Sequence, residues 1–388
     1  MRVLHVTPYF APAFRYGGPP RSILGLCQAL GTAGVDVEVF TTTANGDAPL
    51  APAPDGIAYE GVPVRYFPLA WPQRYWRARG LRAALTRAAA TADLIHVHGL
   101  WNMTSWAGVA VARAAGKPCV ISPRGMLQPE AMQRHREMKS LAYWGIERAN
   151  LRSAAVLHAT SALEGRELTP YGPPVVLIPN GVMSSSATPD AIARMRARAD
   201  VGADDDVVTF LGRLHPIKRL DLLAEAFAIV HHARPNARLV IAGPDEGGYR
   251  QQVDAMFAPV AGATRWIGAV DSGASAALLA SSRVLVQCSD SESFGMSVAE
   301  ALAAGVPVVV TRRSGWAEVD VIGCGFTVGH DPVSIADGIL RVLDHADPAS
   351  MRKRASAWAR QKFGWDAIGT AMRDAYEQAI VRAARRVA

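Results

Sequence analysis

Residues 282–310 read SRVLVQCSDSESFGMSVAEALAAGVPVVV, and this stretch decides the fold. It contains an apolar, strand-like run at 282–287, a polar loop, a helical pattern at 297–304 and a β-branched run at 306–310. Gly305 follows the helical pattern, where a helix C-terminus favours glycine. A strand, a helix and a second strand in this order predict two parallel strands joined by a crossover helix.

The same alternation recurs along the whole chain of 388 residues. Its strand-like runs are rich in β-branched residues and do not alternate with polar ones, which is typical of buried parallel strands. They are Val3–Thr7, Val35–Thr41, Leu94–His98, Cys119–Ser122, Ala155–Ala159 and Val175–Ile178 in the first half, and Val207–Leu211, Arg238–Ala242, Val284–Gln287 and Val306–Val310 in the second. So many strands, with amphipathic helices between them, predict two doubly wound α/β sheets.

The domain boundary is expected after the turn-rich segment Tyr171-Gly-Pro-Pro174. We therefore assign residues 1–175 to a first domain and residues 176–365 to a second. The remaining residues, 366–388, form a helical pattern after the second sheet should be complete.

The composition favours a folded α/β protein, because 50% of the residues are apolar and 19% are charged. No apolar run reaches the length of a membrane-spanning helix, and the first residues are strand-like rather than a signal peptide. Cys27, Cys119, Cys288 and Cys324 show neither metal nor disulfide spacing. We therefore expect buried free thiols in a cytoplasmic protein.

All of the net positive charge belongs to the first half of the chain. Residues 1–175 contain 18 basic and 11 acidic residues, whereas residues 176–388 contain 23 of each. The segment Trp71–Ala90 holds five arginines, three aromatic residues and no acid. Such a segment is typical of peripheral contact with an anionic membrane or a phosphorylated partner, although a solvated arginine-rich helix explains it equally well. Nucleic acid is not expected as a partner, since no nucleic-acid motif accompanies the charge.

Ligands of open α/β sheets bind beyond the carboxyl ends of the strands, so the residues that follow each strand are candidates for a site. In the first half, Gly17 and Gly18 precede a helix and can let backbone approach a phosphate. His98 ends a strand, and we expect at most one of His96 and His98 to belong to a site. Arg124, at the end of the next strand, is a candidate anion contact.

In the second half, cations and glycines follow the strands. Arg213 and Lys218 flank a proline turn between a strand and a helix, and two such cations could hold a diphosphate. A solvated basic turn is the alternative interpretation. Gly243 ends the following strand, and Gly268 offers another glycine turn. The sequence contains neither a Gly-x-Gly-x-x-Gly pattern nor a Walker lysine, which argues against dinucleotide dehydrogenases and P-loop enzymes.

Glu292 and Glu300 stand eight residues apart in the opening stretch. Glu292 is expected in the loop, and Glu300 about one turn inside the helix. The backbone N–H groups of Phe294, Gly295 and Met296 stand at the helix start, where unpaired donors can bind an electronegative group. An acid that complements the helix dipole, beside a second acid on a solvated face, explains the same pattern.

Together these motifs resemble the retaining glycosyltransferases of the GT-B architecture, sequence family 4. The matching residues follow the family's order along nearly the whole chain, and they are Gly17-Gly18, His96-Val-His98-Gly99, Ile178-Pro-Asn180-Gly181, Gly212-Arg213-Leu214 with Lys218, Gly243-Pro244, and Glu292-Ser-Phe294-Gly295 with Glu300. Phe363-Gly-Trp365 and the final helix are similar to the family's closing segment, which returns to the first domain. The resemblance implies two Rossmann-like domains facing a central cleft, the first for the acceptor and the second for the donor.

The resemblance also implies roles for single residues. Arg213 and Lys218 would neutralise the donor diphosphate and stabilise the leaving nucleotide. Glu300 would bind the ribose, and Glu292 would hold the donor sugar together with the backbone amides of Phe294–Met296. The other implied positions are His98 near the anomeric centre, Gly17 and Arg124 at the acceptor, and Gly18, Gly243 and Gly268 at the donor.

The resemblance implies a UDP- or GDP-sugar as donor and no metal, because the two cations replace it. The acidic run Asp204–Asp206 precedes a strand, and we interpret it as a solvated turn. The expected acceptor is a hydroxyl of a lipid-linked glycan in bacterial polysaccharide assembly, with Trp71–Ala90 touching the inner face of the cytoplasmic membrane. Two alternatives stay open: a GT-B-like sugar-nucleotide epimerase or phosphorylase, and a non-catalytic subunit that binds sugar nucleotides.

Overall fold

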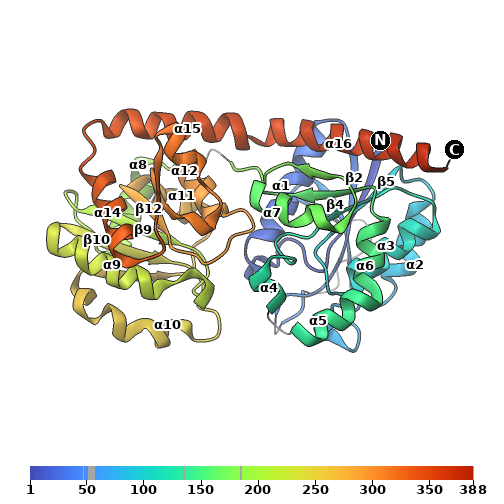
Figure 1. The fold of residues 1–388 in the computed structure, drawn as a ribbon, viewed down its shortest axis with the longest axis horizontal. Coiled ribbons are helices and arrows are strands. Elements are labelled where there is room, and N and C mark those ends of the chain that lie inside the picture. The colour runs from blue at the N-terminus through green and yellow to red at the C-terminus, as the bar shows by residue number, and fades with distance from the viewer. Residues whose placement is uncertain (47, 51–56, 134–135, 184–185, 388) are drawn as a thin grey trace. The chain divides into compact units, whose positions relative to one another are not determined.

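The protein folds into two compact units, each a central sheet covered by helices (Figure 1). The computed structural model describes residues 1–46, 48–50, 57–133, 136–183 and 186–387. The first unit comprises Met1–Gly181 and Trp365–Ala388, and the second comprises Val182–Gly364. Among the described residues, every helix is either too short or too polar to cross a lipid bilayer.

The first unit is built on a sheet with the strand order β3-β4-β2-β1-β5-β6-β7-β8. Its strands are β1 Arg2–Val6, β2 Asp36–Thr42, β3 Ile57–Tyr59, β4 Val62–Phe67, β5 Leu94–His98, β6 Cys119–Ser122, β7 Val156–Ala159 and β8 Val175–Leu177. All neighbours pair in parallel except β3 and β4, which form an antiparallel edge.

Most helices of the first unit connect these strands, and a last helix, α16, joins the unit from the far end of the sequence. They are α1 Gly18–Thr32, α2 Leu81–Ala89, α3 Met103–Ala114, α4 Pro129–Gln133, α5 Arg136–Ala142, α6 Arg148–Ser153, α7 Ala162–Leu168 and α16 Trp365–Val387, with a π-helical turn, η3 Tyr143–Glu147, between α5 and α6. In Figure 1, α16 lies beside α1 in the first unit.

The second unit is built on an all-parallel sheet with the strand order β11-β10-β9-β12-β13-β14. Its strands are β9 Asp206–Leu211, β10 Ala237–Ala242, β11 Thr264–Gly268, β12 Val284–Gln287, β13 Val308–Thr311 and β14 Gly325–Val328. Its α-helices are α8 Pro189–Arg198, α9 Leu220–Ala233, α10 Tyr249–Val253, α11 Ser272–Ser281, α12 Met296–Ala303, α13 Glu318–Ile322, α14 Pro332–Leu343 and α15 Pro348–Phe363. A short 3₁₀ helix, η5 Pro216–Lys218, leads into α9.

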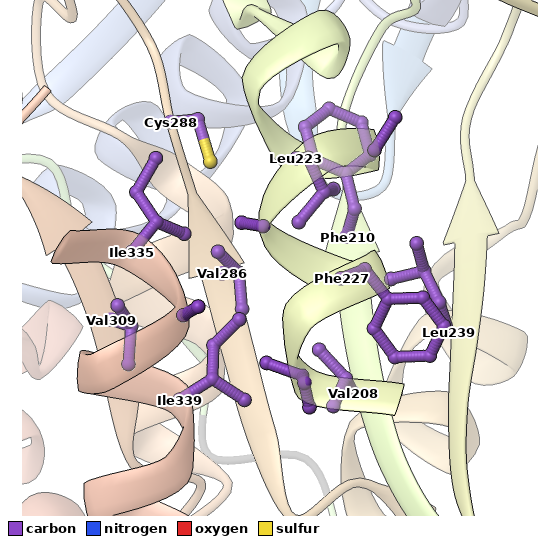
Figure 2. Close-up of a cluster of buried hydrophobic side chains, with 14 of the residues drawn as sticks. Val208, Phe210, Leu223, Phe227, Leu239, Val286, Cys288, Val309, Ile335 and Ile339 are labelled. Carbon is purple, nitrogen blue, oxygen red and sulfur yellow. The ribbon is translucent and has the colours of Figure 1, made fainter. Parts of the chain in front are cut away.

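One core of the second unit lies between the sheet and the pair α9 and α14 (Figure 2). Phe210 of β9 and Phe227 of α9 are fully buried there, and Val286 of β12 packs toward Ile339 of α14. Truncating a buried side chain of this size typically costs about 2–5 kcal/mol. This packing holds the carboxyl ends of β9, β10 and β12 in a fixed geometry.

The final helix, from Trp365 onward, belongs to the first unit, whereas Phe363 and Gly364 belong to the second. The indole of Trp365 fills the space beside two glycines: a Cβ added at Gly25 would lie 2.2 Å from the Trp365 ring, and one at Gly181 would lie 2.3 Å from it. Any side chain at either glycine would therefore displace the tryptophan. Five buried α16 residues continue the contact into a core of the first unit, namely Ile368, Met372, Ala375, Tyr376 and Ala379.

The structure corrects several boundaries. The first unit continues to Gly181 rather than to residue 175, because β8 pairs with β7 and so belongs to the first sheet. Gly268, expected in a turn, is the last residue of a strand. Strands β3, β4, β11 and β14 were missed, because their sequences are short or contain Pro, Arg or Gly. The prediction of four buried, free cysteines is confirmed.

Candidate active site

Three adjacent strands of the second unit end in glycine. Gly212 follows β9 and donates its N–H to Ala242 O of β10 over 2.9 Å, and Gly243 donates its N–H to Gly268 O of β11 over 2.8 Å. Gly243 has a φ of 148°, and a Cβ there would lie 1.8 Å from Gly212 O. Only glycine fits this position, so bare backbone lines this edge of the sheet.

Beside these glycines, Lys218 and Glu292 form an ion pair between Nζ and Oε1. Lys218 ends η5, and Glu292 lies in the loop between β12 and α12. Their side chains are only 13% and 10% exposed. Gln287 Nε2 and Ser289 Oγ donate to the same carboxylate oxygen, the serine over 2.8 Å. Packing against α9 and β12 thus fixes a carboxylate and an ammonium group in contact.

The pair is ionised at neutral pH. Burial alone would raise the pKa of Glu292, but the Lys218 ammonium and the hydrogen bonds from Lys218, Ser289 and Gln287 outweigh it and lower the pKa below its ordinary value. An ammonium has three donors. Lys218 can therefore hold Glu292 with one N–H and offer its charge to a bound anion as well.

The loop after Glu292 leads to the start of α12, where Gly295 is buried and Met296 is half-buried. Gly295 has a φ of 87° and precedes the helix, and its carbonyl accepts from Val298 N–H at 3.0 Å and Ala299 N–H at 3.2 Å. The Phe294 side chain is 5% exposed, and its carbonyl accepts the indole N–H of Trp316 at 2.7 Å. The phenyl ring therefore belongs to the core, and only the Phe294 backbone is available to a ligand.

The remaining predicted donor residues are more accessible. Arg213 is 42% exposed and pairs with Glu246. Glu300 and Met296 lie on α12, where both are half-buried. The structure thus brings Lys218 and Glu292 into direct contact and places Arg213 against an acid that the sequence did not single out.

Sequence reasoning missed a second charged cluster in this unit. The carboxylate of Asp290 lies 3.3 Å from Arg219, 3.3 Å from Arg313 and 3.1 Å from His330. Arg313 follows β13 and His330 follows β14, so both stand at strand ends. The rule that ligands bind beyond strand ends could have found Arg313, because Val306–Val310 was recognised as a strand, and it would have found His330 had β14 been recognised.

In the first unit, four buried histidines gather on the sheet. His5 lies on β1, His96 and His98 on β5, and His158 on β7, and none is more than 2% exposed. At most one of His96 and His98 was expected to belong to a site, yet the structure brings the two rings together. Residues two apart on a strand share a face, and the ring centroids of these two lie 4.0 Å apart.

The direction of one hydrogen-bond chain through these rings follows from its last member. The carbonyl of Ile178 can only accept, so His158 Nε2 donates to it over 2.7 Å. His158 Nδ1 then accepts from Ser122 Oγ at 2.7 Å, and Ser122 Oγ accepts from His96 Nε2 at 2.6 Å. His96 Nδ1 finally accepts from the Tyr376 hydroxyl at 2.6 Å. The whole chain is satisfied with both histidines neutral.

A second chain begins at Arg124. Its guanidinium donates to His98 Nδ1 at 3.3 Å from Nε, to Ser22 Oγ at 3.1 Å and to Asn180 Oδ1 at 3.3 Å. Because guanidinium cannot accept, His98 carries its proton on Nε2 and donates to His5 Nδ1 over 3.0 Å. Arg124 itself has a φ of 55°, so its backbone is held in a conformation that non-glycine residues rarely adopt.

The rings are neutral and the guanidinium is charged. Burial, followed by the nearby Arg124 charge, lowers the pKa of His5 to about 3, and burial lowers that of His158 to about 4. The pKa values of His96 and His98 also lie well below the ordinary value, chiefly because of burial. Burial lowers the pKa of Arg124 to about 10, which leaves it protonated at neutral pH. Among the described residues, its recorded hydrogen-bond partners are all neutral, although the buried Glu164 carboxylate acts on the guanidinium electrostatically and raises its pKa. The guanidinium is therefore not in a direct ion pair there and can meet an incoming anion.

His5, His96 and His98 offer ring nitrogens within 4.8 Å of one another, as a metal site would. Their chemistry does not fit that use. The His5 Nδ1 and His98 Nε2 atoms already bond to each other, and the Arg124 guanidinium stands against His98. A cation placed here would break these bonds and lie beside a fixed positive charge.

The glycine loop of the first unit caps α1. Gly17 has a φ of 85° and donates its N–H to Phe14 O at 3.0 Å, and Gly18 is the first residue of the helix. Two prolines follow within the first turn, where their missing N–H groups cost nothing. The loop therefore places small residues at the start of α1, near Ser22, which contacts Arg124.

Two family descriptions match the chain, one in each unit. "Glycosyl transferase 4-like domain" matches residues 17–181, and "Glycosyl transferases group 1" matches residues 192–362. A curated D-inositol 3-phosphate glycosyltransferase from Streptomyces scabiei is 30% identical over 98% of this chain and 91% of that protein. A second one, from Acidothermus cellulolyticus, is 29% identical over all of this chain and 91% of its own length.

Solved structures share the fold at lower identity. Sucrose-phosphate synthase from Thermosynechococcus elongatus superposes with a TM-score of 0.77 at 20% identity, covering 98% of this chain and 100% of that one. Anabaena HepE in complex with UDP and glucose superposes with a TM-score of 0.73 at 20% identity, covering 97% and 99%. Each superposition therefore covers nearly the whole of this chain and of the solved structure, rather than a single domain.

Proposed function

The chain belongs to the group 1 glycosyl transferases of GT-B fold, and from this membership we propose that it transfers a sugar from a UDP- or GDP-sugar to an acceptor hydroxyl with retention of the anomeric configuration. The observation that carries the proposal is the buried Lys218–Glu292 ion pair beside the glycine edge of the second sheet. UDP and glucose in the similar HepE structure favour a UDP-sugar among the two donors.

On the donor side, the cations act on the leaving group. Negative charge grows on the diphosphate as its bond to the sugar breaks, and a preorganised ammonium lowers the energy of that state selectively. Lys218 takes this role, with Arg213 exchanging Glu246 for the diphosphate. Glu292 accepts hydrogen bonds from the donor sugar, and Glu300 accepts them from the ribose. No metal is required, because fixed cations supply the charge.

In this proposal the acceptor attacks from the side of the departing diphosphate, and the acceptor proton passes to a diphosphate oxygen. The bond from the anomeric carbon to the diphosphate breaks as the bond to the acceptor oxygen forms on the same face. Glu292 is held by the ion pair with Lys218 and by hydrogen bonds from Gln287 and Ser289, which suits a positioning contact better than a free nucleophile.

On the acceptor side, Arg124 binds an anionic group of the acceptor. Its direct hydrogen-bond partners are neutral, Glu164 acts on it only electrostatically, and Ser22 and Asn180 hold it in place. We assign His98 to positioning Arg124 rather than to direct contact with the sugar, since His98 is 1% exposed. A lipid-linked glycan with a diphosphate bridge carries such an anion. A small phosphorylated acceptor, as in the name of the Streptomyces relative, is the second candidate.

The exposed segment Trp71–Ala90 supports a membrane-borne acceptor. All five of its arginines are exposed, and Trp71 is 84% exposed. A polybasic segment of this kind is attracted to anionic lipid at low ionic strength. This attraction would bring the first unit to the inner face of the cytoplasmic membrane.

The test is a thermal-shift panel of UDP-, GDP- and ADP-sugars, followed by transfer assays with the donor that binds. A donor that binds only the folded state raises the melting temperature by mass action. Transfer to a phosphate-bearing acceptor, with retained anomeric configuration by NMR, supports the proposal. Tight donor binding without turnover over many acceptors would favour a non-catalytic subunit, and an altered free sugar nucleotide would favour an epimerase.

A further inference from the structure

The segment from α5 to α6 carries an unusual surface on the first unit, which we name the α5–α6 ridge. Met138, Leu141, Trp144 and Ile146 are 54%, 78%, 65% and 38% exposed, although all four are large and apolar. They lie within nine residues of one another in a nearly continuous helix, through the π-helical turn η3 (Figure 1). Exposed large apolar side chains are ordinary singly but indicate an interaction site when they gather.

The inner side of the same helix is firmly anchored. Leu151 is fully buried in another hydrophobic cluster of the first unit, one that the α16 residues do not join. Glu147, 1% exposed, accepts the Trp106 indole N–H at 2.7 Å and the Trp101 backbone N–H at 2.7 Å. The ridge is therefore the outward face of a packed element. It belongs to the surface of the folded unit.

Basic residues surround the apolar ones. The ridge contains Arg136, Lys139, Arg148 and Arg152 against two acids, of which Glu147 is buried. The guanidinium of Arg148 lies 4.8 Å from the Trp144 ring centroid. An apolar stripe with tryptophan and flanking cations is the composition of helices that lie in the headgroup layer of anionic membranes. A second protein surface would have to bury these cations as well, at a desolvation cost.

We propose that the α5–α6 ridge is a membrane-docking surface that inserts Leu141, Trp144 and Met138 into an anionic lipid leaflet. It is distinct from Trp71–Ala90, because it offers apolar insertion where that segment offers mainly charge. The two differ in their response to salt: screening weakens attraction between exposed charges but leaves apolar burial intact. The proposal concerns binding to lipid alone and does not rest on the glycosyl transfer reaction.

The experiment measures co-sedimentation of the full chain with vesicles, without donor or acceptor. The test variant is Leu141→Ser with Trp144→Ser. The matched control is Val321→Ser with Val333→Ser, which removes two exposed apolar side chains of the second unit that are 87% and 69% exposed. Vesicles are phosphatidylcholine with or without phosphatidylglycerol, at low and at high salt.

We expect the wild type and the control to bind phosphatidylglycerol vesicles equally, and the test variant to bind at least about tenfold more weakly, because two apolar side chains no longer leave water. Part of the wild-type binding should survive high salt. Circular dichroism and melting temperature should not change, since both altered side chains are exposed.

Three outcomes would overturn the proposal. One is equal binding by the test variant and the wild type. Another is no sedimentation of the wild type at low salt. The third is a concentration-dependent dimer that the same double substitution abolishes, without vesicle binding, which would assign the ridge to a second copy of the chain. Since no sugar is transferred in the assay, none of these bears on the reaction itself.

Discussion

The strand ends of the two units hold buried polar groups of opposite kinds. In the second unit, Lys218 and Glu292 are both charged and cancel each other. In the first, four histidines are neutral, and Arg124 donates to one of them and to two other neutral side chains, while Glu164 acts on it only electrostatically. The difference shows that the two units would bind a charged ligand in different ways. The second unit has a balanced ion pair whose cation can also bind an anion, whereas the Arg124 cation of the first unit is in no direct ion pair among the described residues.

The largest expected difference between the two regions is the loss of stability on acidification. The folded pKa values of the four histidines lie below the unfolded value of about 6.5, so the unfolded chain binds more protons as the pH falls. Stability that is present above about pH 6.5 is lost below it, by about 5 kcal/mol in total at pH 5.5. Glu292 has a lowered pKa, so its contribution is retained until the pH falls below about 4.

Peptide-resolved hydrogen exchange at pH 7 and pH 5.5, corrected for the intrinsic rate, checks this expectation. Strands β1, β5 and β7 should lose protection at pH 5.5, while β9 and β12 keep it. Equal loss in both units would remove the contrast between neutral and charged networks.

The next largest effect is expected from the ion pair. Lys218→Met should lower transfer by about 10³-fold, because the charge that meets the leaving group is gone, and should cost about 3–5 kcal/mol of stability by leaving the Glu292 carboxylate unpaired. The double variant Lys218→Met with Glu292→Gln should regain stability without regaining transfer. Steady-state kinetics and calorimetric melting check both points, and near-normal turnover in either variant would contradict the assignment.

Substitution of Arg124 tests the buried cation of the first unit. Arg124→Met should raise the acceptor KM about 10²-fold while the donor Kd stays unchanged, because an anion contact worth about 3 kcal/mol is lost. Arg124→Lys should recover only part of it, since an ammonium lacks the planar fork. Arg113→Met, an exposed arginine on α3, is the matched control. If the substitution weakened donor binding more than acceptor binding, Arg124 would contact the donor and the assignment would be wrong.

The smallest effect is expected from the far end of the histidine chain. Tyr376→Phe removes the donor to His96 Nδ1 and should cost about 1–2 kcal/mol of stability. Differential scanning calorimetry measures this, with Tyr75→Phe as a control outside the network. An unchanged melting temperature would show that the tyrosine hydroxyl does not hold the ring.

Most of the fold could be predicted because the central strands appear in the sequence as continuous apolar runs. Leu94–His98 and Val284–Gln287 are buried on both faces, so their sequences are continuous apolar runs, and the structure places both at the predicted bounds. The missed strands β3, β11 and β14 are sheet edges with a single neighbour. Edge strands tolerate Arg, Gly and polar residues, so their sequences carry a weaker signal.

The candidate site was predictable only in part. The strand-end rule found Lys218 and Glu292 because each follows a recognisable strand, but it could not show that they touch, since 74 residues separate them. The histidine network could not be predicted either, because its residues are also far apart in the sequence. It depends on Tyr376, which has no strand or motif to mark it and which only the packing of α16 brings to the sheet.

The hydrogen bond between His96 and Tyr376 joins residues 280 positions apart. During synthesis, every strand of the second unit therefore leaves the ribosome before the first unit receives the helix that completes its core. Domains generally fold as units as the chain emerges, so the later half can mature first while the earlier half waits with Gly25 and its neighbouring apolar residues uncovered. Residues 365–388 complete a unit whose strands are translated before those of the second unit.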